Sequence, residues 1–82
     1  MTYSQAKHPV DVVVVFKKQK PEPLIMRWNK RYVRIQKVHL IHSERVGREK
    51  LYYFSVSDHV NAYRLSFSTE SLQWYLDELR TL

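Results

Sequence analysis

The sequence contains no cysteine and a single glycine, and both shortages restrict the sites it can form. Without cysteine there is no disulfide, no thiolate metal site and no thiol nucleophile. One glycine, Gly47, is too few for a glycine-rich phosphate loop or a Gly-x-Ser-x-Gly elbow. Most turns must therefore be located from changes in the hydrophobic pattern.

Long hydrophobic runs are also missing. The longest is VVVVF at residues 12–16, whereas a membrane-spanning helix needs about 20 apolar residues. The first ten residues have no apolar core of the kind found in signal peptides. These features predict a soluble, cytoplasmic protein with no membrane partner. The 82 residues allow one small domain, and 44% hydrophobic residues suit a folded chain.

Positive charge is concentrated in the middle of the chain. The net charge is +6, yet residues 17–50 hold eleven Lys and Arg against three acids, or +8. Residues 1–16 are neutral, and residues 51–82 carry −2. Such asymmetry indicates a polyanionic partner, although many basic side chains only keep a small protein soluble.

Short β-branched and aromatic runs predict a mostly β domain over residues 10–82. About five or six antiparallel strands would form a bent sheet or a partly open barrel. Residues 1–9 are expected to be a flexible arm, residues 10–18 a strand, and the proline-containing residues 18–23 a connection. Hairpin turns are expected at residues 29–30, 43–48 and 58–61, with a bulge near Gln36–Lys37 where the apolar positions change parity.

The clearest strand signal lies between residues 52 and 67. Tyr52, Phe54 and Val56 alternate with polar residues, and so do Tyr63, Leu65 and Phe67, as expected for a hairpin with one buried face. The predicted core consists of Val12, Val14, Phe16, Val33, Ile35, Leu40, Tyr52, Phe54, Val56, Tyr63, Leu65, Phe67, Trp74 and Leu76.

Residues 70–80 fit two structures. Leu72, Tyr75, Leu76 and Leu79 would form one stripe of a helix, whereas Leu72, Trp74 and Leu76 alternate as in a strand. The pattern alone slightly favours the helix.

The order RWNKRYVRIQKV, VGREKLYYFSVSD, AYRLSFSTESLQWYLDEL resembles a family of small bacterial domains of unknown function. Some stand alone, and related ones end proteins similar to Y-family DNA polymerases. The resemblance covers about residues 24–79 and carries no activity. The matching residues are Trp28, Lys30, Arg31, Tyr32, Ile35, Tyr53, Phe54, Val56, Tyr63, Leu65, Phe67, Trp74 and Leu76. It implies a small β domain with a link to DNA metabolism.

In the resembling domains the final Trp-x-Leu lies on a strand. The resemblance therefore favours a strand over residues 70–80 and leaves a C-terminal helix as the alternative. These domains often have glycine at the first turn, where this chain has Asn29–Lys30. The tilt of Trp28 consequently stays open.

The segment MRWNKRYVRI, residues 26–35, is the candidate binding site. In an extended chain its aromatic and basic side chains of one parity would line one face: Met26, Trp28, Lys30, Tyr32 and Arg34. Aromatic rings stack on unpaired bases while cations contact phosphates, so we expect single-stranded nucleic-acid binding. The candidate residues are Arg27, Trp28, Lys30, Arg31, Tyr32, Arg34, Lys37 and Tyr53. A turn at 29–30 would instead put Trp28 and Tyr32 on paired strands, and burial of both would leave only a charged rim.

No pattern indicates catalysis or metal binding. Ser57, Asp58 and His59 are neighbours in a turn, unlike a catalytic triad, and His39 and His42 would face opposite sides of a strand. The sequence predicts no enzyme, no cofactor, no metal and no small-molecule substrate. The rival function is protein interaction, in which residues 10–16 pair edge to edge with a protein partner or with a second copy in a homodimer.

Overall fold

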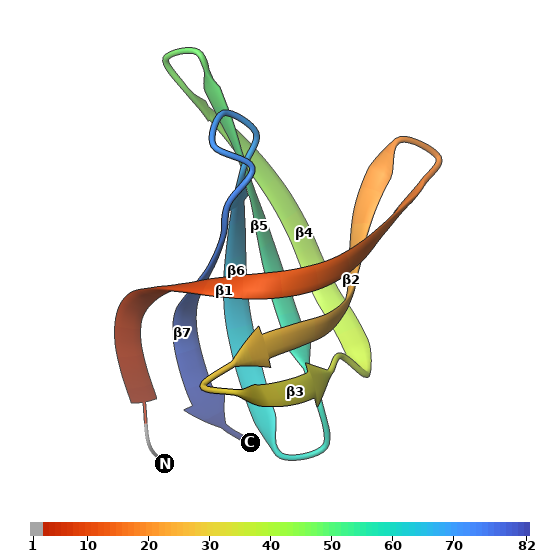
Figure 1. Ribbon diagram of the computed structural model, residues 1–82, viewed down its shortest axis with the longest axis vertical. Helices are drawn as coiled ribbons and strands as arrows, with labels where there is room; N and C mark the ends of the chain where they lie inside the picture. The colour runs from red at the N-terminus through yellow and green to blue at the C-terminus, as the bar shows by residue number, and fades with distance from the viewer. Residues whose placement is uncertain (1–2) are drawn as a thin grey trace.

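The computed structural model describes residues 3–82, and the side chains of residues 7–82. Seven antiparallel strands form one open, strongly bent sheet (Figure 1). The strands are β1 (Tyr3–Lys17), β2 (Lys20–Trp28), β3 (Arg31–Arg34), β4 (Lys37–Val46), β5 (Glu49–Ser57), β6 (Asn61–Ser68) and β7 (Trp74–Thr81). Their order in the sheet is β3-β2-β1-β7-β6-β5-β4. The predicted mostly β, partly open fold is confirmed, with more strands than expected.

The described part of the chain contains no helix. Accordingly, no helix there is long and apolar enough to cross a membrane. The alternative of a helix over residues 70–80 is wrong, because Trp74–Thr81 forms β7 between β1 and β6. The strand favoured by the resemblance is the one observed.

The long strand β1 joins the two parts of the sheet. Its first half, up to Val10, pairs with β7, and its second half, from Asp11 to Lys17, pairs with β2. The strand bends between the halves, so β1, β2 and β3 cross over β7, β6, β5 and β4 (Figure 1). Residues 3–9, expected as an arm, are thus part of β1, and residues 1–2 lie outside the described residues.

The core fills the space between the two parts of the sheet. Its buried side chains are Val10, Met26, Phe54, Val56, Tyr63, Leu65, Phe67, Trp74 and Leu76. The ring of Trp74 lies between Phe54 at 5.2 Å and Phe67 at 4.8 Å between centroids. The predicted inward residues between 52 and 67 are buried, except Tyr52, which is half-buried. Ser66, on the side expected to face outward, is also buried, and Val10 and Met26 were missed.

Two predicted core residues, Phe16 and Leu40, are instead 63% and 60% exposed. Leu40 lies at an irregularity of β4: Val38 is opposite the buried Val56, but Leu40 is opposite Ser55, so the extra residue turns Leu40 outward. Phe16 points to the inner side, as its alternation predicts. It stays exposed because the β1–β2 hairpin extends beyond the elements that would cover it (Figure 1).

The expected connection at residues 18–23 is wrong, since Lys20–Pro23 already belong to β2. Lys17 pairs with Lys20 across a two-residue turn, and such a pair is hydrogen-bonded in both directions. By alternation Pro21 and Pro23 occupy the non-hydrogen-bonded positions, so their missing N–H groups face away from β1. Two prolines therefore remove no bond from this ladder.

Two hairpin turns use left-handed backbone without glycine. Lys18 and Gln19 have φ of 52° and 65°, and Asn29 and Lys30 have 51° and 61°. Positive φ at both central positions is the pattern of type I′ turns, whose twist suits paired strands. The turn predicted at 29–30 is confirmed. The loop expected at 43–48 is shorter than predicted, because β4 continues to Val46 and only Gly47, with φ 63°, and the next residue separate it from β5.

The irregularity predicted near Gln36–Lys37 is a break between two strands. β3 ends at Arg34 and β4 begins at Lys37. Ile35 N donates to Leu24 O and Gln36 N donates to Ser57 O, both at 2.9 Å. The chain therefore passes at this point from the β2 side of the sheet to β5.

The turn at residues 58–61, also confirmed, is held by one carboxylate. Asp58 Oδ1 accepts from Val60 N at 2.8 Å and Asn61 N at 2.7 Å, and Oδ2 accepts from the buried Tyr63 hydroxyl at 3.0 Å. Burial alone would raise the pKa of Asp58, but these hydrogen bonds together lower it below the ordinary value.

Asp58→Ala is expected to cost about 2 kcal/mol of unfolding free energy at pH 7, because three bonds to a charged acceptor are removed. A carboxyl whose folded pKa is lowered stabilises the fold above its unfolded pKa of about 3.9. That contribution disappears as pH falls through the folded pKa. Urea unfolding of both proteins at pH 7 and at about pH 2 measures this. A difference between them that does not shrink in acid would contradict the assignment.

Candidate nucleic-acid interface

The β2–β3 hairpin divides the predicted binding residues between its two faces. Arg27 is directly opposite Tyr32, and Trp28 is opposite Arg31. Residues opposite each other share a face, and Met26, two positions before Trp28, is fully buried. Trp28 and Arg31 thus lie on the inner side, and Tyr32 and Arg27 on the outer side. The expectation of a single face from Met26 to Arg34 is wrong, because the turn resets the alternation.

The outer face of this hairpin carries an open tyrosine between two arginines. Tyr32 is 75% exposed. Arg27 lies across the ladder from it, and Arg34, two residues along β3, points to the same side. We call Arg27, Tyr32 and Arg34 the hairpin face.

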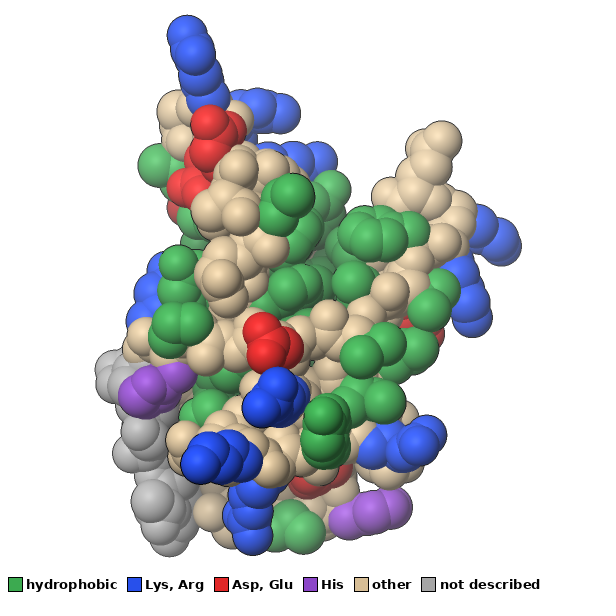
Figure 2. Space-filling view, viewed as in Figure 1, with side chains coloured by type: hydrophobic (Ala, Val, Ile, Leu, Met, Phe, Trp, Pro, Cys, Tyr) green, Lys and Arg blue, Asp and Glu red, His purple; other side chains and the backbone are tan. Residues whose placement is uncertain are grey.

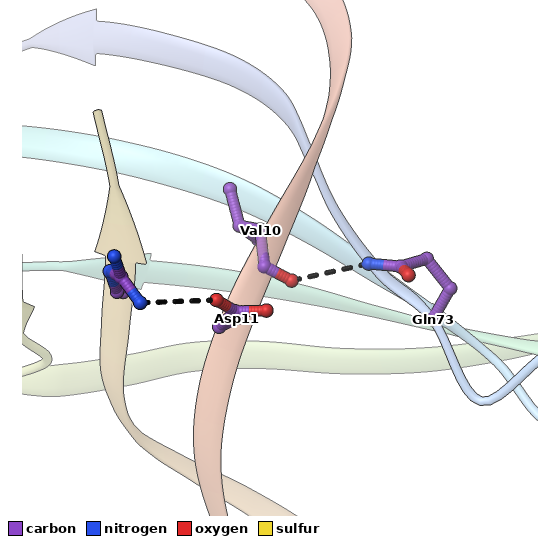
Figure 3. A network of polar contacts seen from close by, with 4 residues as sticks. Val10, Asp11 and Gln73 are labelled. Atoms are coloured by element: carbon purple, nitrogen blue, oxygen red, sulfur yellow. Dashed lines mark hydrogen bonds and ion pairs between the residues drawn. The ribbon is translucent and has the colours of Figure 1, made fainter. Parts of the chain in front are cut away.

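Most cations around the hairpin face are unpaired. Arg27 Nη1 lies 3.9 Å from Asp11 Oδ2 on β1 (Figure 3), but these side chains are 52% and 81% exposed, so the pair is weak. Among the described residues no ion pair involves Lys30, Arg31, Arg34 or Lys37. Their charges are therefore available to an anionic ligand.

Trp28 is only half-buried and packs against the core. It also lines a hollow of about 400 Å³ at the bend of β1, together with Arg27, Lys30 and Gln73. Gln73 Nε2 donates to Val10 O at 3.3 Å and closes one side of this hollow (Figure 3). The structure thus brings Trp28 next to the cations of the hairpin but not onto the face of Tyr32.

Tyr53 lies apart from the other candidates. It lines a groove formed by residues of β1, β4, β5, β6 and β7, and no residue of the β2–β3 hairpin lines that groove. Its ring stacks on His42 at 5.6 Å, and burial, followed by the nearby Glu44, raises the pKa of its hydroxyl. The third aromatic platform expected from the sequence is therefore not adjacent to Tyr32. Lys37 begins β4, opposite Ser57.

Tyr53 lines a groove of about 650 Å³ on the outer side of the larger part of the sheet. Charges of both signs surround it: Lys7, Glu44, Arg64, Asp77 and Glu78. Arg64 Nη1 lies 3.2 Å from Glu78 Oε2, and burial raises the pKa of Asp77 although Ser66 donates a hydrogen bond to it. No sequence pattern indicated this groove, because its residues come from five strands.

Figure 2 shows where charged and hydrophobic side chains gather. Lys and Arg stand at the ends of the two projecting hairpins and below the crossing strand β1. Hydrophobic side chains lie at the base of the notch between the projecting hairpins and cover part of the crossing strands. The basic middle of the sequence is thus spread over three hairpins. Two of them also carry a mostly exposed aromatic ring, Phe16 on the β1–β2 hairpin and Tyr32 on the β2–β3 hairpin.

Residues 10–16, expected as a pairing edge, are open on one side only. The ladder with β7 ends at Val10, and from Asp11 onward β1 pairs with β2. In the described part of the chain no strand pairs with the other side of residues 11–17.

Comparisons of the chain with protein-family models, with curated proteins and with solved structures found no match.

Proposed function

We propose that this protein binds single-stranded nucleic acid through the hairpin face, without catalysing a reaction. Tyr32 would stack on an unpaired base, and Arg27 and Arg34 would contact the phosphates on either side. The observation that carries the proposal is the 75% exposed ring of Tyr32 beside two arginines on the same face of the hairpin.

The expected energies favour this function over a plain solvated surface. Stacking of one base on an aromatic ring contributes about 1–3 kcal/mol. Each phosphate contact adds a salt-dependent term, because bound counterions are released. Lys30, Arg31 and Lys37 extend the positive surface beyond the hairpin face. A single exposed aromatic ring is common on protein surfaces, so the proposal rests on the combination of the Tyr32 ring with the neighbouring arginines.

A single strand suits the hairpin face better than a duplex. Stacking needs a base whose face is free, which only an unpaired strand offers. The face is also short, since β3 has only four residues. The resemblance to bacterial domains at the ends of DNA polymerases, together with the cysteine-free composition, fits a nucleic-acid partner in the cytoplasm.

Chemical-shift mapping with an oligothymidylate of about ten nucleotides locates the site. At low salt, we expect the largest chemical-shift changes at the amides of Arg27, Tyr32 and Arg34. The amides around the half-buried side chain of Trp28 should change less. The signals of Tyr53 and its groove should stay in place. Shifts confined to that groove, or no shifts at low salt, would refute the proposal.

A further inference from the structure

Two large apolar side chains, Phe16 and Leu72, are exposed and are covered by no other part of the described chain. Phe16 is 63% exposed, although a domain of this size needs its aromatic residues for the core. Leu72 is 72% exposed and has a left-handed backbone with φ 59°. That conformation costs a leucine about 1–2 kcal/mol, and the exposed side chain returns no packing. Both residues line the same groove.

This groove, which we call the edge groove, lies between the second half of β1 and the loop before β7. Its volume is about 400 Å³. Its apolar lining comes from Val12, Val14, Phe16, Phe67, Leu72 and Trp74. The bottom is the buried Phe67 and Trp74, and the two sides are Phe16 and Leu72. An occupant of the edge groove would cover both exposed side chains.

The side of the edge groove along β1 is an unpaired strand edge. Lys17 and Lys20 close a two-residue hairpin, so Lys17 and Val15 direct their N–H and C=O groups toward β2. Val14 and Phe16 therefore direct theirs away from β2, toward the edge groove. At the start of this edge Val10 O is already occupied by Gln73 Nε2. An extended chain laid along the edge would complete this ladder.

The charge beside the edge groove indicates the sign of the occupant. Lys17, Lys18 and Lys20 lie at the end of the same hairpin. Of these three lysines, only Lys17 forms an ion pair within the described part of the chain, with Glu22 at 3.7 Å. At the other end Asp11 lines the edge groove, and its carboxylate lies 3.9 Å from Arg27 Nη1, so the acidic side chains of an occupant would lie at the lysine end. A second copy of this basic protein would bring like charges together, whereas an acidic segment would be attracted.

We propose that the edge groove binds an extended, acidic segment of a partner protein as an added β-strand. The segment hydrogen-bonds to the free edge of Val14 and Phe16. Alternate apolar side chains enter the edge groove, and acidic side chains lie beside Lys17, Lys18 and Lys20. This mode of binding takes affinity from the backbone and specificity from every second side chain. It does not depend on the proposed nucleic-acid binding, which uses a different face.

The test uses a capped peptide of alternating glutamate and valine, titrated into the labelled protein. We expect shifts at Val12–Phe16 and Leu72–Trp74, and a dissociation constant at least about tenfold lower than for the lysine–valine counterpart. Equal binding of both peptides, or no binding of either, would overturn the proposal. So would a protein dimer that the substitutions below dissociate, because the occupant would then be a second copy.

Three variants separate the groove from the fold. Leu72→Asp places a charge in the edge groove at a backbone position that aspartate tolerates, so folding should be retained while peptide affinity falls about tenfold or more. Val14→Pro removes one donor from the free edge and none from the β2 ladder, and should also weaken binding. Val60→Asp makes the same charge change at a side chain that is 60% exposed in another turn, and should have no effect. Binding unchanged in folded Leu72→Asp would contradict the assignment.

Discussion

Phe54→Ala is expected to lower the free energy of unfolding by about 3–5 kcal/mol. Phe54 has no exposed surface, and its ring lies 5.2 Å from that of Trp74, where the two parts of the sheet face each other. The cavity cannot easily close, because the surrounding side chains belong to strands fixed by their ladders. A domain of 82 residues has a total stability of roughly 4–12 kcal/mol. The expected loss is therefore a large fraction of the total stability.

Phe16→Ala is the matched control for this prediction. It removes the same atoms from a side chain that is 63% exposed, so a loss below about 1 kcal/mol is expected. Urea unfolding followed by tryptophan fluorescence measures both variants. Similar losses at the two positions would mean that the core does not lie where the structure places it.

Local alternation was sufficient to predict the central hairpin. Phe54 and Val56 on one strand and Tyr63, Leu65 and Phe67 on the next are buried as expected, and the turn between the strands is fixed by the bonds to Asp58. These elements pair with sequence neighbours, so pattern and contact agree. The strand at Trp74 was different, because helical and strand spacing both fitted, and only the resemblance favoured the strand.

Alternation gives the direction of a side chain but not what covers it. Phe16 points inward as predicted, yet its hairpin extends beyond the opposing strands, which are distant in sequence. Pro21 and Pro23 were predicted to lie in a connection between strands, because the sequence does not show which edge of the strand their nitrogens face. Leu40 faces outward because an extra residue in β4 shifts the pairing after Val38. In each case the deciding contact is non-local.

The turn predicted at residues 29–30 divides the candidate binding segment, residues 26–35, between the two faces of the β2–β3 hairpin. The type I′ turn at Asn29–Lys30 places Trp28 across from Arg31, and Tyr32 across from Arg27. Tyr32 is open and Trp28 packs on the core, so only one of the two stacking platforms of this segment lies fully at the surface. The anomalous exposure of Leu72 had no sequence signal, since its left-handed backbone is set by the loop before β7.

Tyr32→Ala is expected to weaken binding of single-stranded DNA about tenfold, which corresponds to about 1.4 kcal/mol and lies within the range for one stacked base. Its folding stability should change by less than about 0.5 kcal/mol, because the ring is 75% exposed. The double variant Arg27→Ala with Arg34→Ala should also bind more weakly. In addition it should lower the slope of log affinity against log salt by about 0.7 for each phosphate that the protein no longer neutralises.

The most direct test is fluorescence anisotropy of a labelled oligothymidylate titrated with the wild-type protein, Tyr32→Ala and Tyr53→Ala at low and moderate salt. Tyr53→Ala is the matched control, since that tyrosine lies on β5, away from the hairpin face. The account predicts salt-dependent binding that only Tyr32→Ala weakens, by about tenfold. Binding that does not change with salt, or equal losses in the two tyrosine variants, would contradict the assignment of nucleic-acid binding to the β2–β3 hairpin.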